Sequence, residues 1–112
     1  MGEFDTGLEL PQGTLDLLIL RALTLGPRHG WGITERLEQV SRHAVRVKQG
    51  SLYPALHRLE RQGLVRGRWG ASESNRRAKY YELTRKGRVR LREQTALWER
   101  LQQAVGHVLE EA

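Results

Sequence analysis

Residues 50–65 read Gly-Ser-Leu-Tyr-Pro-Ala-Leu-His-Arg-Leu-Glu-Arg-Gln-Gly-Leu-Val, and they are the most informative part of the chain. Its apolar side chains recur at helical spacing, which predicts an amphipathic helix over about 50–62. They are Leu52, Ala55, Leu56 and Leu59. The opposite edge is polar and basic, so we expect one side of the helix on a core and the other in solvent.

Both ends of this helix are marked in the sequence. Pro54 is tolerated only in a first turn, where its missing N–H would have no helical acceptor. The helix should therefore begin near Gly50 or Ser51, with Ser51 as its cap. Gly63 fits the C-terminal stop.

The flanking segments supply the rest of a small domain. Apolar periodicity predicts helices over about 13–25 and 31–40, and a weak alternation predicts a short strand at 45–47. Two strand patterns, at 64–69 and 78–83, enclose a polar tip and predict a hairpin. A long helix is expected over about 85–110.

This order of elements is that of a winged helix-turn-helix, a mainly α fold with a small β-hairpin wing, here followed by a long C-terminal helix. At 112 residues, about one domain is expected. We expect the winged helix to occupy residues 8–84 and the final helix residues 85–112.

Charge is segregated along the chain. Residues 42–92 hold 15 of the 19 lysines and arginines and only three acids, so they carry +12. The remainder holds four bases and ten acids and carries −6. Such a basic block is expected where one face meets a polyanion, and a merely solvated basic surface is the weaker alternative. Double-stranded DNA is therefore the expected partner, with the helix over 50–62 in the major groove and the hairpin on the flanking backbone.

The DNA-binding side chains can be assigned from a helical wheel, on which one set lies opposite the apolar edge and a second set flanks it. The first set is Pro54, His57 and Arg61, the second is Ser51, Tyr53 and Arg58, and Lys48 and Gln49 precede them. Arg58 is expected to fork onto guanine O6 and N7, and Tyr53 and Ser51 to bind phosphates. Tyr53 as a half-buried core residue and His57 as a surface residue without contact remain alternatives.

The hairpin adds five basic side chains to this expected DNA-binding set. They are Arg66, Arg68, Arg76, Arg77 and Lys79. Strand alternation places the first two on one face of their strand and the last two on one face of the next. We expect these charges on phosphates, or one arginine in the minor groove, with binding that is sensitive to salt. Tyr80 and Tyr81 point to opposite faces, one toward the core and one toward the DNA.

The predicted C-terminal helix carries a narrow apolar seam of the coiled-coil kind. Its members are Leu91, Trp98, Leu101, Val105 and Val108. A small domain cannot cover the far half of such a helix, so we expect a homodimer, which would set two recognition helices about one DNA turn apart on a pseudo-palindromic site. Trp98 beside its symmetry mate would line a flat slot for a planar aromatic effector, with plain interface packing as the alternative. Trp31 is expected in the core, and Trp69 in the core or as hairpin support.

Other classes of function have little support. The chain has no cysteine, only two aspartates and four scattered histidines, so we expect no metal site, no cofactor and no enzyme activity. No apolar run approaches the roughly 20 residues of a membrane span, and a cytoplasmic protein without a secretory signal is expected. The remaining alternatives are a winged helix that binds protein or RNA, and a protein that binds nucleic acid without sequence preference.

Several segments resemble the PadR-type transcriptional regulators. They are Leu10-Pro-Gln-Gly-Thr-Leu-Asp16, Gly26-Pro-Arg-His-Gly-Trp-Gly-Ile33, Gly50-Ser-Leu-Tyr-Pro-Ala-Leu-His-Arg-Leu-Glu60, Gly63-Leu64, and Arg77-Ala-Lys-Tyr-Tyr-Glu-Leu-Thr84 with Gly87. The resemblance covers roughly residues 8–90. It implies a homodimeric bacterial DNA-binding regulator of the short-tailed branch, usually a repressor and often released by a phenolic or drug-like compound. Family members often have serine or proline just before the glycine of the third helix, where this chain has Lys48-Gln49.

Overall fold

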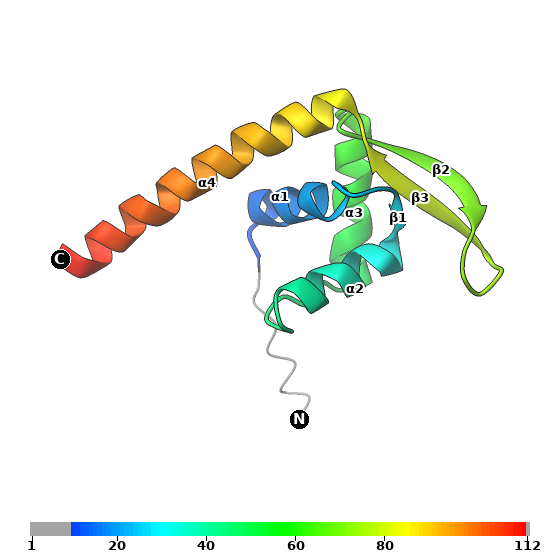
Figure 1. Cartoon of the computed structure of the whole chain (residues 1–112), viewed down its shortest axis with the longest axis horizontal. Coiled ribbons are helices and arrows are strands. Elements are labelled where there is room, and N and C mark those ends of the chain that lie inside the picture. The colour runs from blue at the N-terminus through cyan, green and yellow to red at the C-terminus, as the bar shows by residue number, and fades with distance from the viewer. Residues whose placement is uncertain (1–9, 112) are drawn as a thin grey trace.

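The computed structural model describes residues 10–111 as a helical domain from which a hairpin and one long helix project on opposite sides (Figure 1). Its elements are α1 (Gln12–Ala22), β1 (Arg28–His29), α2 (Gly30–Val40), α3 (Gln49–Arg61), β2 (Val65–Ala71), β3 (Arg77–Leu83) and α4 (Arg85–Glu111). The predicted mainly α winged helix-turn-helix fold is confirmed. All four predicted helices are present, although α1 ends three residues early.

The strand predicted at 45–47 is absent from the described structure, where residues 45–48 are irregular. Val45 and Val47 are partly buried and pack against the core, so their alternation reflects packing and not sheet pairing. The third strand is instead β1, whose residues Arg28 and His29 pair with Tyr81 and Tyr80 of β3. A two-residue strand is too short to show the alternation by which strands are recognised.

The expected N-cap of the third helix is wrong, although the helix begins at Gln49, one residue before the expected start near Gly50. Lys48 occupies the N-cap position without a side-chain capping hydrogen bond, and Ser51 lies inside the first turn. Pro54 therefore lies in the second turn, where it cannot donate to the carbonyl of Gly50. Both of these residues are exposed. Gly63 ends the helix with φ +76°, the left-handed conformation expected of a C-terminal glycine.

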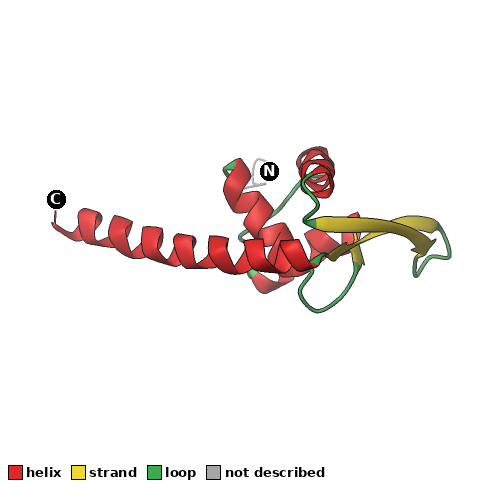
Figure 2. Cartoon of the chain, turned by 90° about the horizontal axis from the view of Figure 1, so that it is seen from above, coloured by secondary structure: helices red, strands yellow, loops and turns green. Residues whose placement is uncertain are grey.

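The sheet is antiparallel with the strand order β1-β3-β2. Strands β2 and β3 pair from Val65↔Leu83 to Ala71↔Arg77 and form the extended hairpin seen from above in Figure 2. This register shows which of the two tyrosines faces the core. Tyr81 is buried in the core, and Tyr80 lies on the opposite face beside the His29 ring.

The base of α4 is fixed to the domain by a close backbone approach. Thr84 Oγ1 accepts the N–H of Gly87 at 3.0 Å and donates to the carbonyl of Gly63 at 2.6 Å. Gly87 is buried, and a Cβ atom there would meet the carbonyl oxygen of Leu64. Only glycine permits this approach. Four residues later Leu91 enters the core, and beyond Thr95 every described residue of α4 is exposed.

Candidate nucleic-acid interface

Helix α3 has one buried side and one exposed side. Its apolar residues lie in the core, where they contact the elements that surround the helix. The exposed side, with the residue that precedes it, carries most of the predicted DNA-binding residues of this segment: Lys48, Ser51, Tyr53, Pro54, His57 and Arg61. The helix thus offers an unobstructed polar and basic edge, beside which the hairpin extends (Figure 1).

Two residues predicted for this edge lie elsewhere. Nη2 of Arg58 binds Oδ1 of Asp16 in α1 at 2.5 Å, both side chains are mostly buried, and Nε of Arg58 is buried without a partner. Arg58 therefore ties α3 to α1, and the expectation that it reads guanine is corrected. Gln49 is partly buried and donates to Oγ1 of Thr34 in α2 at 3.4 Å, so its amide also faces the domain. A wheel gives the angle of a side chain but not the neighbour that lies against it.

The outer face of the wing carries a charge cluster at its base. Arg66 and Arg68 each bind Oε2 of Glu82 at 2.9 Å. Hydrogen bonds from Arg66, and then from Arg68, hold the pKa of Glu82 below its ordinary value of 4.5. The shared carboxylate offsets part of the positive charge that this face presents.

Glu82→Gln is expected to lower stability at neutral pH by an amount that disappears in acid. The pKa of Glu82 is lowered in the folded chain, so its stabilisation is present above pH 4.5 and is lost as the pH falls through the folded-state pKa. Urea unfolding midpoints of the two proteins should therefore converge as the pH falls below 4.5. Glu99→Gln, which removes an exposed carboxylate from α4, is the control. A difference that stays constant with pH would contradict this assignment.

The inner face of the wing, toward α3, holds the other predicted bases. Lys79 binds Oε1 of Glu60 at 3.1 Å and so braces the wing against α3. The guanidinium of Arg77 lies over the ring of Trp69, 5.0 Å from its centroid. Within residues 10–111, Arg76 and Arg77 have no carboxylate partner, which leaves them as the wing cations available to phosphates.

Trp31, which was expected in the core, and Trp69, which was expected in the core or as hairpin support, both border this face. Trp31 is 64% exposed and Trp69 is 60% exposed. They line a groove of about 970 Å³ between the start of α2, α3 and the wing, together with Tyr53, His57 and Arg76. Trp31 lies opposite Ile33 on the α2 wheel, so its exposure was readable from the sequence. Trp69 lies on the core side of β2, but beyond the end of the core.

Comparison with known protein families matches residues 19–93 to the transcriptional regulator PadR-like family. The chain belongs to this family. Among similar proteins, transcriptional regulator Rv3488 of Mycobacterium tuberculosis is 35% identical over 97 residues, which cover 87% of each protein. A PadR family transcriptional regulator of Eggerthella lenta is 36% identical with a TM-score of 0.76, covering 90% of this chain and 86% of that one. A PadR-like transcription factor of Bacteroides fragilis is 33% identical with a TM-score of 0.71, covering 87% and 91%.

The family is one of transcriptional regulators and not of enzymes. Within residues 10–111 of this PadR-like chain, no three His, Asp or Glu side chains are grouped so that they could hold a metal ion. No helix in that range is both long enough and apolar enough to cross a membrane.

The apolar seam of α4 in this PadR-like protein is divided by the structure. Leu91 is 7% exposed and packs in the core of its own chain, so its assignment to a dimer surface is corrected. The other predicted members are exposed: Trp98, Leu101, Val105 and Val108. Leu97 and Leu109 are exposed as well. At 1.5 Å per residue, the 27 residues of α4 span about 40 Å, so its second half extends beyond its own domain.

Proposed function

We propose that this PadR-like regulator binds double-stranded DNA with sequence preference, with α3 in the major groove and the wing along the flanking backbone. The observation that carries the proposal is the exposed edge of α3, formed by Tyr53, Pro54, His57 and Arg61, beside the basic wing. The +12 charge of residues 42–92 supports the same partner. Base contacts from α3 would provide specificity, and cations of the wing would provide most of the salt-dependent affinity.

We also propose that the chain divides into a DNA-binding part, residues 8–84, and a dimerisation helix, residues 85–112. The two outer limits lie outside the described residues 10–111. The support is the exposed apolar row of α4, which no other part of the described chain covers. Two copies paired along this row would present two α3 helices to one side of the DNA, so the expected operator is pseudo-palindromic.

We further propose that the protein is a cytoplasmic repressor and that a small planar aromatic molecule releases it from DNA. The repressor role is proposed from the resemblance to the family, in which regulators that occupy a site overlapping a promoter block transcription. Trp98 is 43% exposed on the α4 row, where its symmetry mate would provide a second aromatic plane for stacking. In the Trp31→Phe/Trp69→Phe variant Trp98 is the remaining tryptophan, and its fluorescence should be quenched by such a ligand.

Arg61→Ala tests the DNA face, with Arg21→Ala as a control that removes the same charge from an exposed position on α1. If α3 lies in the major groove, Arg61→Ala should weaken operator binding about tenfold and reduce the salt slope by about 0.9. Arg21→Ala should leave the slope nearly unchanged. Equal effects of the two substitutions would show that binding follows net charge and not the α3 surface.

A further inference from the structure

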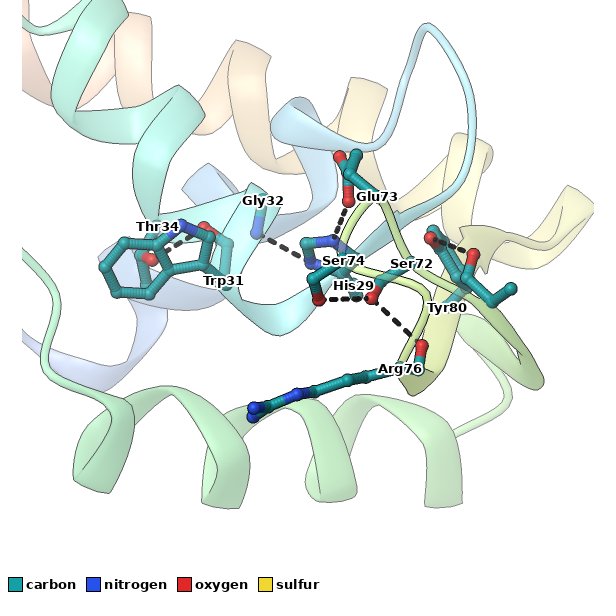
Figure 3. A network of polar contacts seen from close by, with 10 residues as sticks. His29, Trp31, Gly32, Thr34, Ser72, Glu73, Ser74, Arg76 and Tyr80 are labelled. Atoms are coloured by element: carbon teal, nitrogen blue, oxygen red, sulfur yellow. Dashed lines mark hydrogen bonds and ion pairs between the residues drawn. The ribbon is translucent and has the colours of Figure 1, made fainter.

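The tip of the wing is a defined turn and not a loose loop. The N–H and Oγ of Ser72 donate to the carbonyl of Arg76 at 2.8 and 2.9 Å, and the N–H of Asn75 donates to the carbonyl of Ser72 at 2.8 Å. The hydroxyl of Tyr80 donates to the carbonyl of Ala71 at 2.9 Å at the adjoining end of the hairpin. Figure 3 shows the bond from Ser72 to Arg76 and the bond from the Tyr80 hydroxyl at the end of the hairpin. Because these bonds make the turn rigid, a contact between the turn and the rest of the domain would fix the direction of the whole wing tip.

His29 joins the turn to the start of α2, and its hydrogen bonds show which ring nitrogen carries the proton. Nδ1 of His29 accepts the N–H of Gly32 at 3.0 Å, so Nδ1 carries no proton and the neutral ring is protonated at Nε2. Nε2 then donates to Oε1 of Glu73 at 3.2 Å. The ring is held in place, since its side chain is only 14% exposed and its centroid lies 5.1 Å from that of Tyr80. His29 thus caps α2 and fixes the wing tip at the same time (Figure 3).

Glu73 is an unfavourable residue for a surface that meets a polyanion. Its side chain is 86% exposed, and a backbone hydrogen bond, followed by the bond from His29, holds its pKa below 4.5. It is therefore ionised at neutral pH and would repel nearby phosphates. Its contact with His29, which holds the wing tip, would favour DNA binding and so offset this repulsion.

The turn at the wing tip determines where the guanidinium of Arg76 lies. The side chain of Arg76 points from the tip toward α3 in Figure 3 and lines the groove with Trp31, Tyr53 and His57. No acidic partner binds its guanidinium within residues 10–111. The groove lies between α3 and the wing, so a DNA strand at the edge of the major groove would pass along it.

We propose that His29 and Glu73 are positioning residues for DNA binding, which hold the wing tip so that Arg76 reaches a phosphate of the strand beside α3. The inference rests on the proposed DNA-binding function. We call the contact between His29 and Glu73, together with Arg76 that it positions, the clamp. Glu73 contributes indirectly, through the placement of Arg76, and this contribution exceeds its own repulsion of the DNA.

The test is the sign of the change in affinity for two neutral substitutions of Glu73. Glu73→Gln removes the charge but keeps an oxygen that accepts from His29, so operator binding should be as tight as in the wild type or tighter. Glu73→Ala removes the same charge and also the contact, and binding should be about fivefold weaker, with a salt slope lower by about 0.9. Arg76→Ala should weaken the wild type similarly and add little to Glu73→Ala, because the two act through one contact. Tighter binding by both Glu73 variants would overturn the inference.

A second readout needs no DNA. Without the contact the wing tip opens more often, so trypsin should cleave after Arg76 several times faster in free Glu73→Ala than in free Glu73→Gln, as followed by mass spectrometry. Equal cleavage rates in the two variants would also overturn the inference. If the wild type binds no duplex, the proposed function fails and the clamp fails with it. If the wild type binds DNA and the two Glu73 variants behave alike, the clamp alone fails.

Discussion

Replacing Leu101 and Val105 together by aspartate is expected to convert the protein into a monomer and to weaken operator binding by about 100-fold or more. Both side chains are exposed on α4, and the core includes neither, so the fold of one chain should tolerate the change. In a dimer the new carboxylates would be buried without partners, which is strongly unfavourable. A monomer then binds one half-site and loses the gain of roughly 10²-fold or more that comes from linking two binding sites.

Sedimentation velocity at micromolar concentration measures the first effect, and anisotropy titration of operator DNA measures the second. The matched control is Ala96→Asp/Gln103→Asp, which places two aspartates on the opposite side of the same exposed segment. This control should remain a dimer. A Leu101→Asp/Val105→Asp protein that still sediments as a dimer would show that another surface makes the contact.

Gly87→Ala is expected to lower the free energy of unfolding by about 3 kcal/mol, a large share of the stability of a small domain. The added Cβ would lie 2.0 Å from the carbonyl oxygen of Leu64 and 3.2 Å from Cδ2 of Leu83. The backbone oxygen cannot turn aside as a flexible side chain would, so α4 must shift away from the hairpin. The hydrogen bonds through which Thr84 caps α4 would be disturbed with it.

Gly106→Ala is the matched control, because it makes the same change in the same helix where no atom lies within 4 Å of the new Cβ. It should stabilise the protein by up to about 1 kcal/mol through helix propensity. Urea unfolding at one protein concentration compares the three proteins. A Gly87→Ala protein as stable as the wild type would contradict the close approach of α4 to Leu64.

Most of the fold could be predicted because its elements are long enough to show their own period. The apolar spacing of α3 and the alternation of the hairpin strands carry that information locally. β1 has only two residues and forms because the edge of β3 is available, which no local pattern reports. Ser51 is not the cap, because Pro54 is accommodated in the second turn and the helix already begins at Gln49.

The residues of the candidate site could be predicted only where a helical wheel, or the alternation of side chains along a strand, is enough to place them. The exposed edge of α3 follows from the wheel, but the partner of Arg58 is 42 residues away in α1. The contact between His29 and Glu73 joins residues 44 positions apart and has no local signature. In sequence Leu91 has the same spacing as the exposed apolar residues of α4. It is buried only because it lies before the point at which the helix leaves its domain.

Fluorescence anisotropy measures directly whether the protein binds DNA with sequence preference. Wild-type protein would be titrated against duplexes that tile the region around its own gene and against scrambled duplexes of the same composition, at about 50 and about 200 mM salt. We predict one duplex bound about 10³-fold or more tightly than its scrambled counterpart at the higher salt, with affinity for both falling as salt rises. Equal binding to every duplex, scrambled ones included, would show that the protein is not a sequence-specific DNA-binding regulator and that its basic face serves non-specific nucleic acid or another partner.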